Sequence, residues 1–244
     1  MRNIRLDICY DGTRYKGWQR LADTPNTIQG RLERTLTEIL GEEVTVSGSG
    51  RTDAGAHAKG QVANFHCRSD IPCGEILSCL RRYLPEDIGI YSCKEAAPRF
   101  HARLNCKQKT YCYRIWNSDQ PCIWERRYVY VLPETLDLEK MRIAGAYICG
   151  EHDFSAFSTS SGRKKSTVRR IDALDIRKVG GEVRITVTGD GFLYNMVRIL
   201  VGTLIEVGRG TRAPDSIPPL FGGKREQAGY LVPAKGLCLM EVCY

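Results

Sequence analysis

The chain has 244 residues, 42% of them hydrophobic and 26% charged, which is enough apolar material for one large domain or two closely packed halves. Lys and Arg outnumber Asp and Glu by 36 to 28, and the net charge of +8 favours a polyanionic partner such as nucleic acid. No run approaches the roughly 18 apolar residues of a membrane helix, and the first residues lack the apolar core of a signal peptide, so we expect a soluble globular protein.

The first half of the chain alternates strand and helix patterns. Apolar side chains at every second position predict a strand, and apolar side chains at helical spacing predict an amphipathic helix. Gly41 supplies the end of the first helix, and Pro85 the end of the second. The expected elements are strands at 3–10, 43–47 and 61–67 and helices at 27–40 and 76–84.

The second half repeats this rhythm. The expected elements are strands at 107–117, 172–176, 182–188 and 236–244 and helices at 138–148 and 192–208. The mixed order predicts an α+β fold with a largely antiparallel sheet, in an N-terminal half (1–104) and a C-terminal half (105–244). No residue-level repeat is present, so an internal duplication is only a suspicion.

Eleven cysteines are scattered singly along the chain, without a CxxC pair. Those at strand-like positions, such as Cys9, Cys112 and Cys238, fit small reduced core residues. This usage favours a reducing, cytoplasmic compartment.

A basic stretch, STSSGRKKSTVRR, runs from Ser158 to Arg170. Small polar residues surround its cations, a composition typical of an exposed loop. It is either an ordinary solvated loop or an arm that grips phosphates, and the basic balance of the chain slightly favours the arm. Its cations are Arg163, Lys164, Lys165, Arg169 and Arg170.

The usual cofactor and metal motifs are missing from the sequence. There is no GxxxxGK[ST], HExxH or GxSxG, and the four histidines are dispersed. What remains is the stretch SGSGRTDAGAHAKGQ, where Gly48, Gly50 and Gly55 allow a tight turn around Asp53. That carboxylate is either a loop cap, the commoner case, or a catalytic group held ionised by a cation.

Arg198 is the candidate cation. It lies within the apolar run NMVRILVG, where a guanidinium must either extend to water or meet an acid. If Arg198 faces Asp53, it keeps the aspartate charged and fixes its direction, which would make Asp53 a nucleophile awaiting an electrophilic carbon.

Together these residues resemble the tRNA pseudouridine synthase A family. The resemblance covers nearly the whole chain. It departs from the family at Ala56, where valine is usual, and at Asn195, where histidine is frequent. The matching motifs, in family order, are YDGTRYKGWQ from Tyr10, TIQGRLE from Thr27, GSGRTDAGAHAKGQV from Gly48, FHAR from Phe100, KTYCYRI from Lys109 and GFLYNMVRILVG from Gly191.

The resemblance implies a role for each matching residue. Asp53 corresponds to the catalytic aspartate and Arg198 to the arginine that pairs with it. Tyr111 corresponds to the tyrosine that stacks on the target base, and Arg51 to the arginine that displaces this base from the RNA helix. The FHAR segment and the basic loop align with surfaces that contact tRNA, and the implied RNA-binding residues are Phe100, His101, Arg103, Arg163, Lys164, Lys165 and Arg169.

The family isomerises uridine to pseudouridine in the anticodon stem-loop of tRNAs, without a cofactor or a metal. The resemblance therefore implies tRNA as partner, a symmetric homodimer and no membrane association. The implied fold is α+β, with two similar halves that share a mostly antiparallel sheet and an active-site cleft between them. The residues alone leave two alternatives, a non-catalytic RNA-binding protein and an aspartate-dependent hydrolase, which would want a second carboxylate or a metal.

Overall fold

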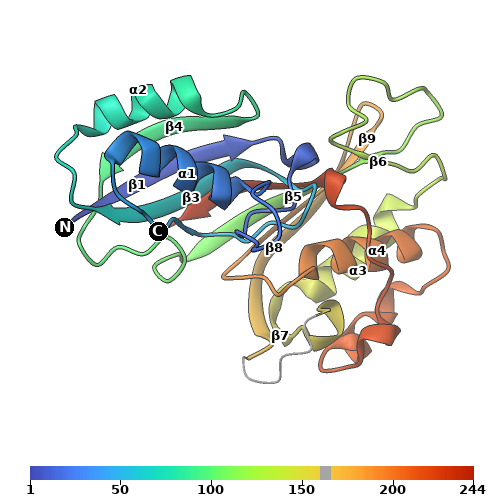
Figure 1. Cartoon of the computed structure of the whole chain (residues 1–244). Coiled ribbons are helices and arrows are strands. Elements are labelled where there is room, and N and C mark those ends of the chain that lie inside the picture. The colour runs from blue at the N-terminus through green and yellow to red at the C-terminus, as the bar shows by residue number, and fades with distance from the viewer. Residues whose placement is uncertain (160–165) are drawn as a thin grey trace. The chain divides into compact units, whose positions relative to one another are not determined.

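The computed structural model describes residues 1–159 and 166–244, and the chain divides into two compact units (Figure 1). Unit 1 comprises Met1–Lys107 and Cys238–Tyr244, and unit 2 comprises Gln108–Leu237. In each unit a mostly antiparallel sheet is combined with two α-helices, so the α+β expectation is confirmed.

The sheet of unit 1 has the strand order β4-β1-β3-β10, with β2 paired to β3. Its pairs are antiparallel except for β10 and β3, which run parallel. The elements are β1 (Arg2–Tyr10), the 3-10 turn η1 (Gly12–Arg14), α1 (Ile28–Leu40), β2 (Ser47–Gly48), β3 (His57–Cys67), α2 (Cys73–Tyr83), β4 (Ile88–Glu95) and β10 (Leu237–Cys243).

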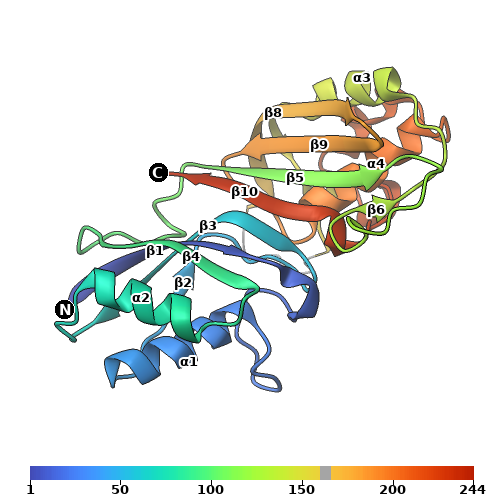
Figure 2. The ribbon, with the colours of Figure 1, turned by 90° about the horizontal axis from the view of Figure 1, so that it is seen from above.

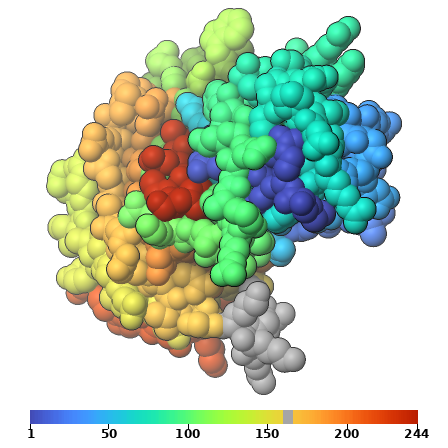
Figure 3. Space-filling model, turned by 90° about the vertical axis from the view of Figure 1, so that its left-hand side faces the viewer, coloured from blue at the N-terminus to red at the C-terminus, as the bar shows by residue number. Residues whose placement is uncertain are grey.

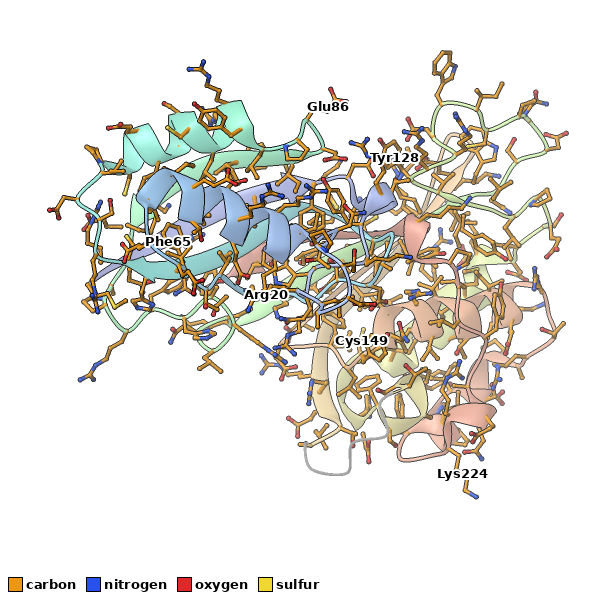
Figure 4. The ribbon with its side chains drawn as sticks, viewed as in Figure 1. Arg20, Phe65, Glu86, Tyr128, Cys149 and Lys224 are labelled. Carbon is orange, nitrogen blue, oxygen red and sulfur yellow. The ribbon has the colours of Figure 1, made fainter. Side chains whose placement is uncertain are left out.

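The alternation predicted for the first strand decides which of its residues form the core of unit 1. Ile4, Leu6 and Ile8 of β1 are fully buried, as is Phe65 of β3, which is labelled in Figure 4. Figure 2 shows α1 and α2 side by side on one face of this sheet. Burial of such a side chain contributes roughly 1.5–3 kcal/mol, so this face supports the strands that carry the candidate site.

Helix α1 begins and ends as its sequence predicts. The Thr27 side chain accepts a hydrogen bond from Gly30 N at 3.1 Å, and Gly41 ends the helix in the left-handed conformation with φ 69°. A Thr cap of this kind contributes about 1 kcal/mol.

The strand expected at 43–47 is wrong, because β2 includes only Ser47 and Gly48. Side chains of α1, rather than a neighbouring strand, satisfy the backbone of Val46. Its N–H donates to Glu33 Oε1 at 3.0 Å, and its carbonyl accepts from Gln29 Nε2 at 3.1 Å. Val44 and Val46 therefore belong to an extended segment that packs against α1 and is not paired with a neighbouring strand.

The sheet of unit 2 has the strand order β5-β9-β8-β7, all antiparallel, and β6 pairs parallel with the end of β5. Helix α3 contacts β8 and α4, and α4 contacts β5. The elements are β5 (Gln108–Trp116), β6 (Tyr130–Val131), α3 (Leu138–Ile148), β7 (Gly150–Asp153), η2 (Ser155–Phe157), β8 (Val168–Val179), β9 (Glu182–Gly189), α4 (Met196–Gly208), η3 (Pro214–Ser216), η4 (Pro218–Leu220), η5 (Arg225–Gln227) and η6 (Ala234–Gly236).

Helix α4 is shorter than the apolar run that predicts it. Ile199, Leu200 and Leu204 are fully buried, as that run requires, but the helix begins at Met196 instead of Phe192. Asn195 has φ 63° and is the only residue other than glycine with a positive φ among residues 1–159 and 166–244. Its left-handed conformation cannot continue into a right-handed helix, so the backbone turns at this residue.

Candidate active site

The loop that carries Asp53 joins β2 to β3 in unit 1, and its backbone is held by the segment that follows β1. Trp18 N donates to Thr52 O at 3.0 Å, and Gly55 N donates to Tyr15 O at 3.3 Å. These two bonds fix the residue before Asp53 and the residue two positions after it. Asp53 is half-buried at this point of the chain.

Two buried polar side chains add to this support on either side of Arg51. The Tyr10 hydroxyl lies 2.7 Å from Thr52 Oγ1. The Gln61 amide accepts from Gly50 N at 3.0 Å and donates to Gly50 O at 2.8 Å, as a neighbouring strand would. Gln61 is fully buried and Tyr10 is 5% exposed, whereas Arg51 is exposed. These contacts of Tyr10 with Thr52 and of Gln61 with Gly50 are called the clamp below. The clamp immobilises the two neighbours of Arg51, and the Arg51 side chain points outward.

Burial also settles the protonation state of this clamp. It raises the pKa of Tyr10 well above its usual value, so the hydroxyl remains neutral and available for hydrogen bonding over the physiological pH range.

The loop lies so close to the first segment that glycine is required there. A Cβ at Gly12 would lie 1.9 Å from the carbonyl oxygen of Ala56, and one at Gly17, whose φ is 94°, would lie 2.8 Å from Thr52 O. Gly12 N also donates to His57 Nδ1 at 3.0 Å. The stretch YDGTRYKGWQ thus forms a cradle for the Asp53 loop, and Ala56, 1% exposed, packs against it.

Arg198 lies in the first turn of α4 in unit 2 and is held in place by two acceptors. Its Nε donates to Val232 O at 2.8 Å and its Nη1 to Asn195 Oδ1 at 3.0 Å. The Asn195 amide in turn donates to Thr159 Oγ1 at 2.7 Å. A cation in the first turn of a helix opposes the helix dipole by about 0.3–1 kcal/mol, and a non-glycine residue in the left-handed region costs a further 1–3 kcal/mol or so. The first cost concerns Arg198 itself, and the second concerns Asn195, which orients its guanidinium. Such unfavourable terms are typical of a functional position.

Tyr111 is on β5 of unit 2, opposite Val187 of β9. Its ring meets the ring of Phe192 edge to face, with centroids 5.1 Å apart and an interplanar angle of 83°. Such pairs fix ring orientation and contribute about 0.5–1.5 kcal/mol. Tyr111 is 8% exposed, so this contact orients a buried ring.

The FHAR segment is anchored in unit 1 by buried side chains. Asn3 Nδ2 donates to Phe100 O at 2.8 Å, and Asn64 Oδ1 accepts from Ala102 N at 2.8 Å. The Phe100 ring packs on the C-terminal Tyr244, with centroids 4.9 Å apart. Figure 3 shows the C-terminal residues, in red, beside the green segment that includes this stretch.

This anchoring divides the FHAR residues into two groups. The Phe100 ring faces Tyr244, and His101 faces the segment itself, since its Nδ1 accepts from Arg103 N at 3.1 Å and from Leu104 N at 3.3 Å. Arg103 and Leu104 are exposed. The contacts of Phe100 and His101 are those of residues that shape the turn, whereas Arg103 is presented at the surface.

The basic loop contributes one described residue to the candidate site. Arg169, at the start of β8, is half-buried and donates from Nη1 to Ser166 O at 2.9 Å and to Val168 O at 2.5 Å. The cations Arg163, Lys164 and Lys165 lie outside the described residues.

Among residues 1–159 and 166–244, no three His, Cys, Asp or Glu side chains are grouped so that they could hold a metal ion. Within the same residues, no helix has the length and apolar character needed to cross a membrane.

The chain is thus an α+β protein with an immobilised Arg-Thr-Asp loop in one unit and an oriented arginine and a tyrosine in the other. A sequence profile described as tRNA pseudouridine synthase matches residues 8–105 and 144–244. The chain belongs to the tRNA pseudouridine synthase family, whose members are isomerases.

Several relatives resemble the chain over its full length. It is 47% identical over 245 aligned residues to "tRNA pseudouridine synthase A 2" of Clostridium perfringens, covering 100% of both chains. It is 44% identical to the protein of that name in Bacillus anthracis, covering 99% of both, and 45% identical to "tRNA pseudouridine synthase A" of Bacillus sp. strain KSM-64, covering 100% of both.

Among solved structures, a chain of a Cbf5-Nop10-Gar1 complex is similar with a TM-score of 0.38 and 12% identity, covering 83% of this chain and 45% of that chain. Family membership rests on the sequence matches.

The site residues came from the sequence, but their supports did not. Asp53 and Arg51 are in unit 1, Arg198 and Tyr111 are in unit 2, and the pairing of Asp53 with Arg198 stays a prediction. No local pattern in the sequence indicates the contacts of Gln61 with Gly50. The close approach of Gly12 could have been suspected from a glycine two residues after the end of a strand.

Proposed function

We propose that this tRNA pseudouridine synthase acts on uridines of the anticodon stem-loop, with Asp53 as its catalytic residue. The observation that supports this most is the clamp on both sides of Arg51. Buried side chains hold Gly50 and Thr52, so an exposed cation and, two residues later, a carboxylate are presented in fixed positions.

The proposed steps use these residues in turn. Arg51 displaces the target base and takes its place in the RNA helix, since a base within a stack is out of reach for chemistry. The flipped uracil stacks on Tyr111, which contributes roughly 1–3 kcal/mol. Asp53 starts the reaction, and Arg198 keeps its carboxylate ionised and directed.

The reaction balances without a further reactant. The bond from the ribose carbon to the uracil nitrogen breaks, the held uracil rotates, and a bond forms from the same ribose carbon to C5 of the base. The proton that leaves C5 is matched by one gained at the freed nitrogen. No electron acceptor, leaving group or water is required.

Recognition of tRNA is proposed to rest on its shape and its phosphates rather than on base sequence, as suits a chain of net charge +8. Arg103, Arg169 and the cations at 163–165 would contact the backbone, and Phe100 and His101 would fix the turn that presents Arg103. We further propose a homodimer, which light scattering would test, and a cytoplasmic location, where tRNA is available.

The test is to incubate unmodified tRNA transcripts with the enzyme and map pseudouridine along them. We expect Asp53→Asn and Asp53→Ala to abolish pseudouridine formation while tRNA binding persists. Asp23→Asn, which changes an exposed aspartate of the same unit, serves as the matched control and should keep full turnover. Unchanged turnover in Asp53→Asn would refute the catalytic assignment, and modification outside the anticodon stem-loop would refute the proposed specificity.

A further inference from the structure

The segment between β5 and β6 exposes two large apolar side chains side by side. Ile123 is 60% exposed and Trp124 is 88% exposed, whereas Trp18 of unit 1 is 1% exposed. In Figure 1 this segment is the green loop that leads to β6. Adjacent exposed apolar side chains of this size are uncommon on a protein surface and indicate a binding surface.

The exposure of Trp124 is not due to a loose loop, because hydrogen bonds tie the segment down on both sides of it. Tyr128, labelled in Figure 4, lies at the end of the last of these bonded turns. The bonds are Trp116 Nε1 to Gln120 O at 2.8 Å, Arg114 Nη2 to Glu125 Oε2 at 2.7 Å, Arg126 Nη1 to Ile123 O at 2.5 Å, Lys235 Nζ to Arg126 O at 3.2 Å and Tyr128 N to Glu125 O at 2.8 Å.

The charge around Trp124 is positive. Its acidic neighbour Glu125 is paired with Arg114, which the buried Glu182 also holds from β9. Arg126 and Arg127, the next two residues, are both exposed. An exposed indole followed by two arginines suits a nucleotide, which offers a flat base and a negative phosphate.

The same segment is tied to the backbone that orients Arg198. Lys235, which donates to Arg126 O, belongs to the stretch 232–236. Val232 O in that stretch accepts the Arg198 Nε hydrogen bond, and Pro233 O accepts from the Tyr113 hydroxyl at 2.7 Å. An RNA bound at Trp124 would therefore contact a segment that is hydrogen-bonded to the stretch supporting Arg198.

We propose that Trp124, with Arg126 and Arg127, forms a second RNA-contacting surface, on which an unpaired nucleotide of the bound tRNA stacks. This proposal rests on tRNA being the substrate. The surface would act in addition to the contacts proposed for Arg51 and Tyr111.

The experiment measures the binding of an unmodified tRNA transcript by fluorescence anisotropy at several salt concentrations. We expect Trp124→Ala to weaken binding between about 5-fold and 150-fold, the loss of one stacked base. Trp124→Phe keeps an aromatic face and should recover most of this loss. Neither Trp124 variant removes a charge, so the salt dependence of tRNA binding should match that of the wild type. The double variant Arg126→Gln, Arg127→Gln should flatten this salt dependence.

Tyr83→Ala is the matched control. Tyr83 is an exposed aromatic residue in unit 1, 60% exposed, with the Arg82 guanidinium 5.6 Å from its ring centroid. We expect this variant to bind tRNA as the wild type does. Equal weakening by both aromatic variants would overturn the proposal, because a general loss of surface contact would then explain it.

Three further results would each overturn the proposal. The first is that Trp124→Ala binds tRNA with unchanged affinity. The second is that Trp124→Ala changes the oligomeric state in light scattering, which would assign the surface to a second copy of the chain. The third is that Trp124→Phe binds tRNA as weakly as Trp124→Ala. Pseudouridine formation by the wild type is followed in parallel. Its absence would count against the proposed function, whereas its presence with unaltered Trp124→Ala binding would count against this surface alone.

Discussion

Replacing Tyr10 by phenylalanine removes one oxygen atom from the buried support of the Asp53 loop. That oxygen lies 2.7 Å from Thr52 Oγ1 and 3.4 Å from Gln61 Nε2. Gln61 keeps its bond to Gly50 O at 2.8 Å, so the hydroxyl of Thr52 is the group left without this partner. The ring itself still fits, because phenylalanine has the same shape.

The expected loss follows from this count. A hydrogen bond contributes about 0.5–1.5 kcal/mol net, and a buried group stranded by its removal costs about 1–3 kcal/mol. We therefore expect Tyr10→Phe to lower the free energy of unfolding by roughly 1–2 kcal/mol, which for a chain of this size lowers Tm by about 2–8 °C. If the same 1–2 kcal/mol is lost from the positioning of Asp53, the chemical step slows about 5-fold to 30-fold.

The assay separates positioning from folding and from binding. Thermal unfolding gives the stability, and a single-turnover rate at saturating tRNA gives the chemical step. Tyr15→Phe is the control, because the Tyr15 hydroxyl donates to Asp87 Oδ1 at 2.5 Å, whereas the Asp53 loop is bonded to the backbone carbonyl of Tyr15, which the substitution keeps. It should lose a similar amount of stability and keep the wild-type rate.

Two results would contradict the reasoning. If Tyr10→Phe were destabilised and yet reacted at the wild-type rate, the clamp would be structural only. If Tyr10→Phe and Tyr15→Phe slowed the reaction equally, general loosening of unit 1 would be the cause.

Three other variants test the remaining geometry. Gly12→Ala should destabilise the protein by about 1–3 kcal/mol in chemical denaturation, because its methyl group would lie 1.9 Å from Ala56 O; wild-type stability would contradict the close approach. Asn195→Gly should relieve backbone strain, so that Tm is kept or raised, and yet slow pseudouridine formation by releasing Arg198; a wild-type rate would show that this contact is dispensable. The pKa of Asp153 is lowered chiefly by a threonine hydroxyl bond, so its ionised form stabilises the fold above the unfolded-state pKa near 4, and this contribution is lost as pH falls below that value. Asp153→Asn should therefore reduce Tm more at pH 7 than at pH 3, and an equal reduction at both would contradict the assignment.

The sequence by itself determined the local elements and the positions of the candidate residues. The strand of alternating apolar residues, the Thr27 and Gly41 ends of α1 and the apolar helix around Arg198 depend on neighbours a few residues away. Such patterns are readable because strand and helix periods act over a single turn or pleat. The family motifs placed Asp53 and Tyr111 in the same way.

Only the tertiary structure decided what holds those residues in place. Tyr10 reaches Thr52 across 42 positions of sequence, and Arg198 reaches Val232 across 34. The expected strand at 43–47 was wrong for the same reason, since a strand forms only where another backbone offers donors and acceptors, and Val46 finds them on α1 side chains. Hydrogen bonds between residues so far apart in the chain depend on how the elements pack, and no local pattern encodes that.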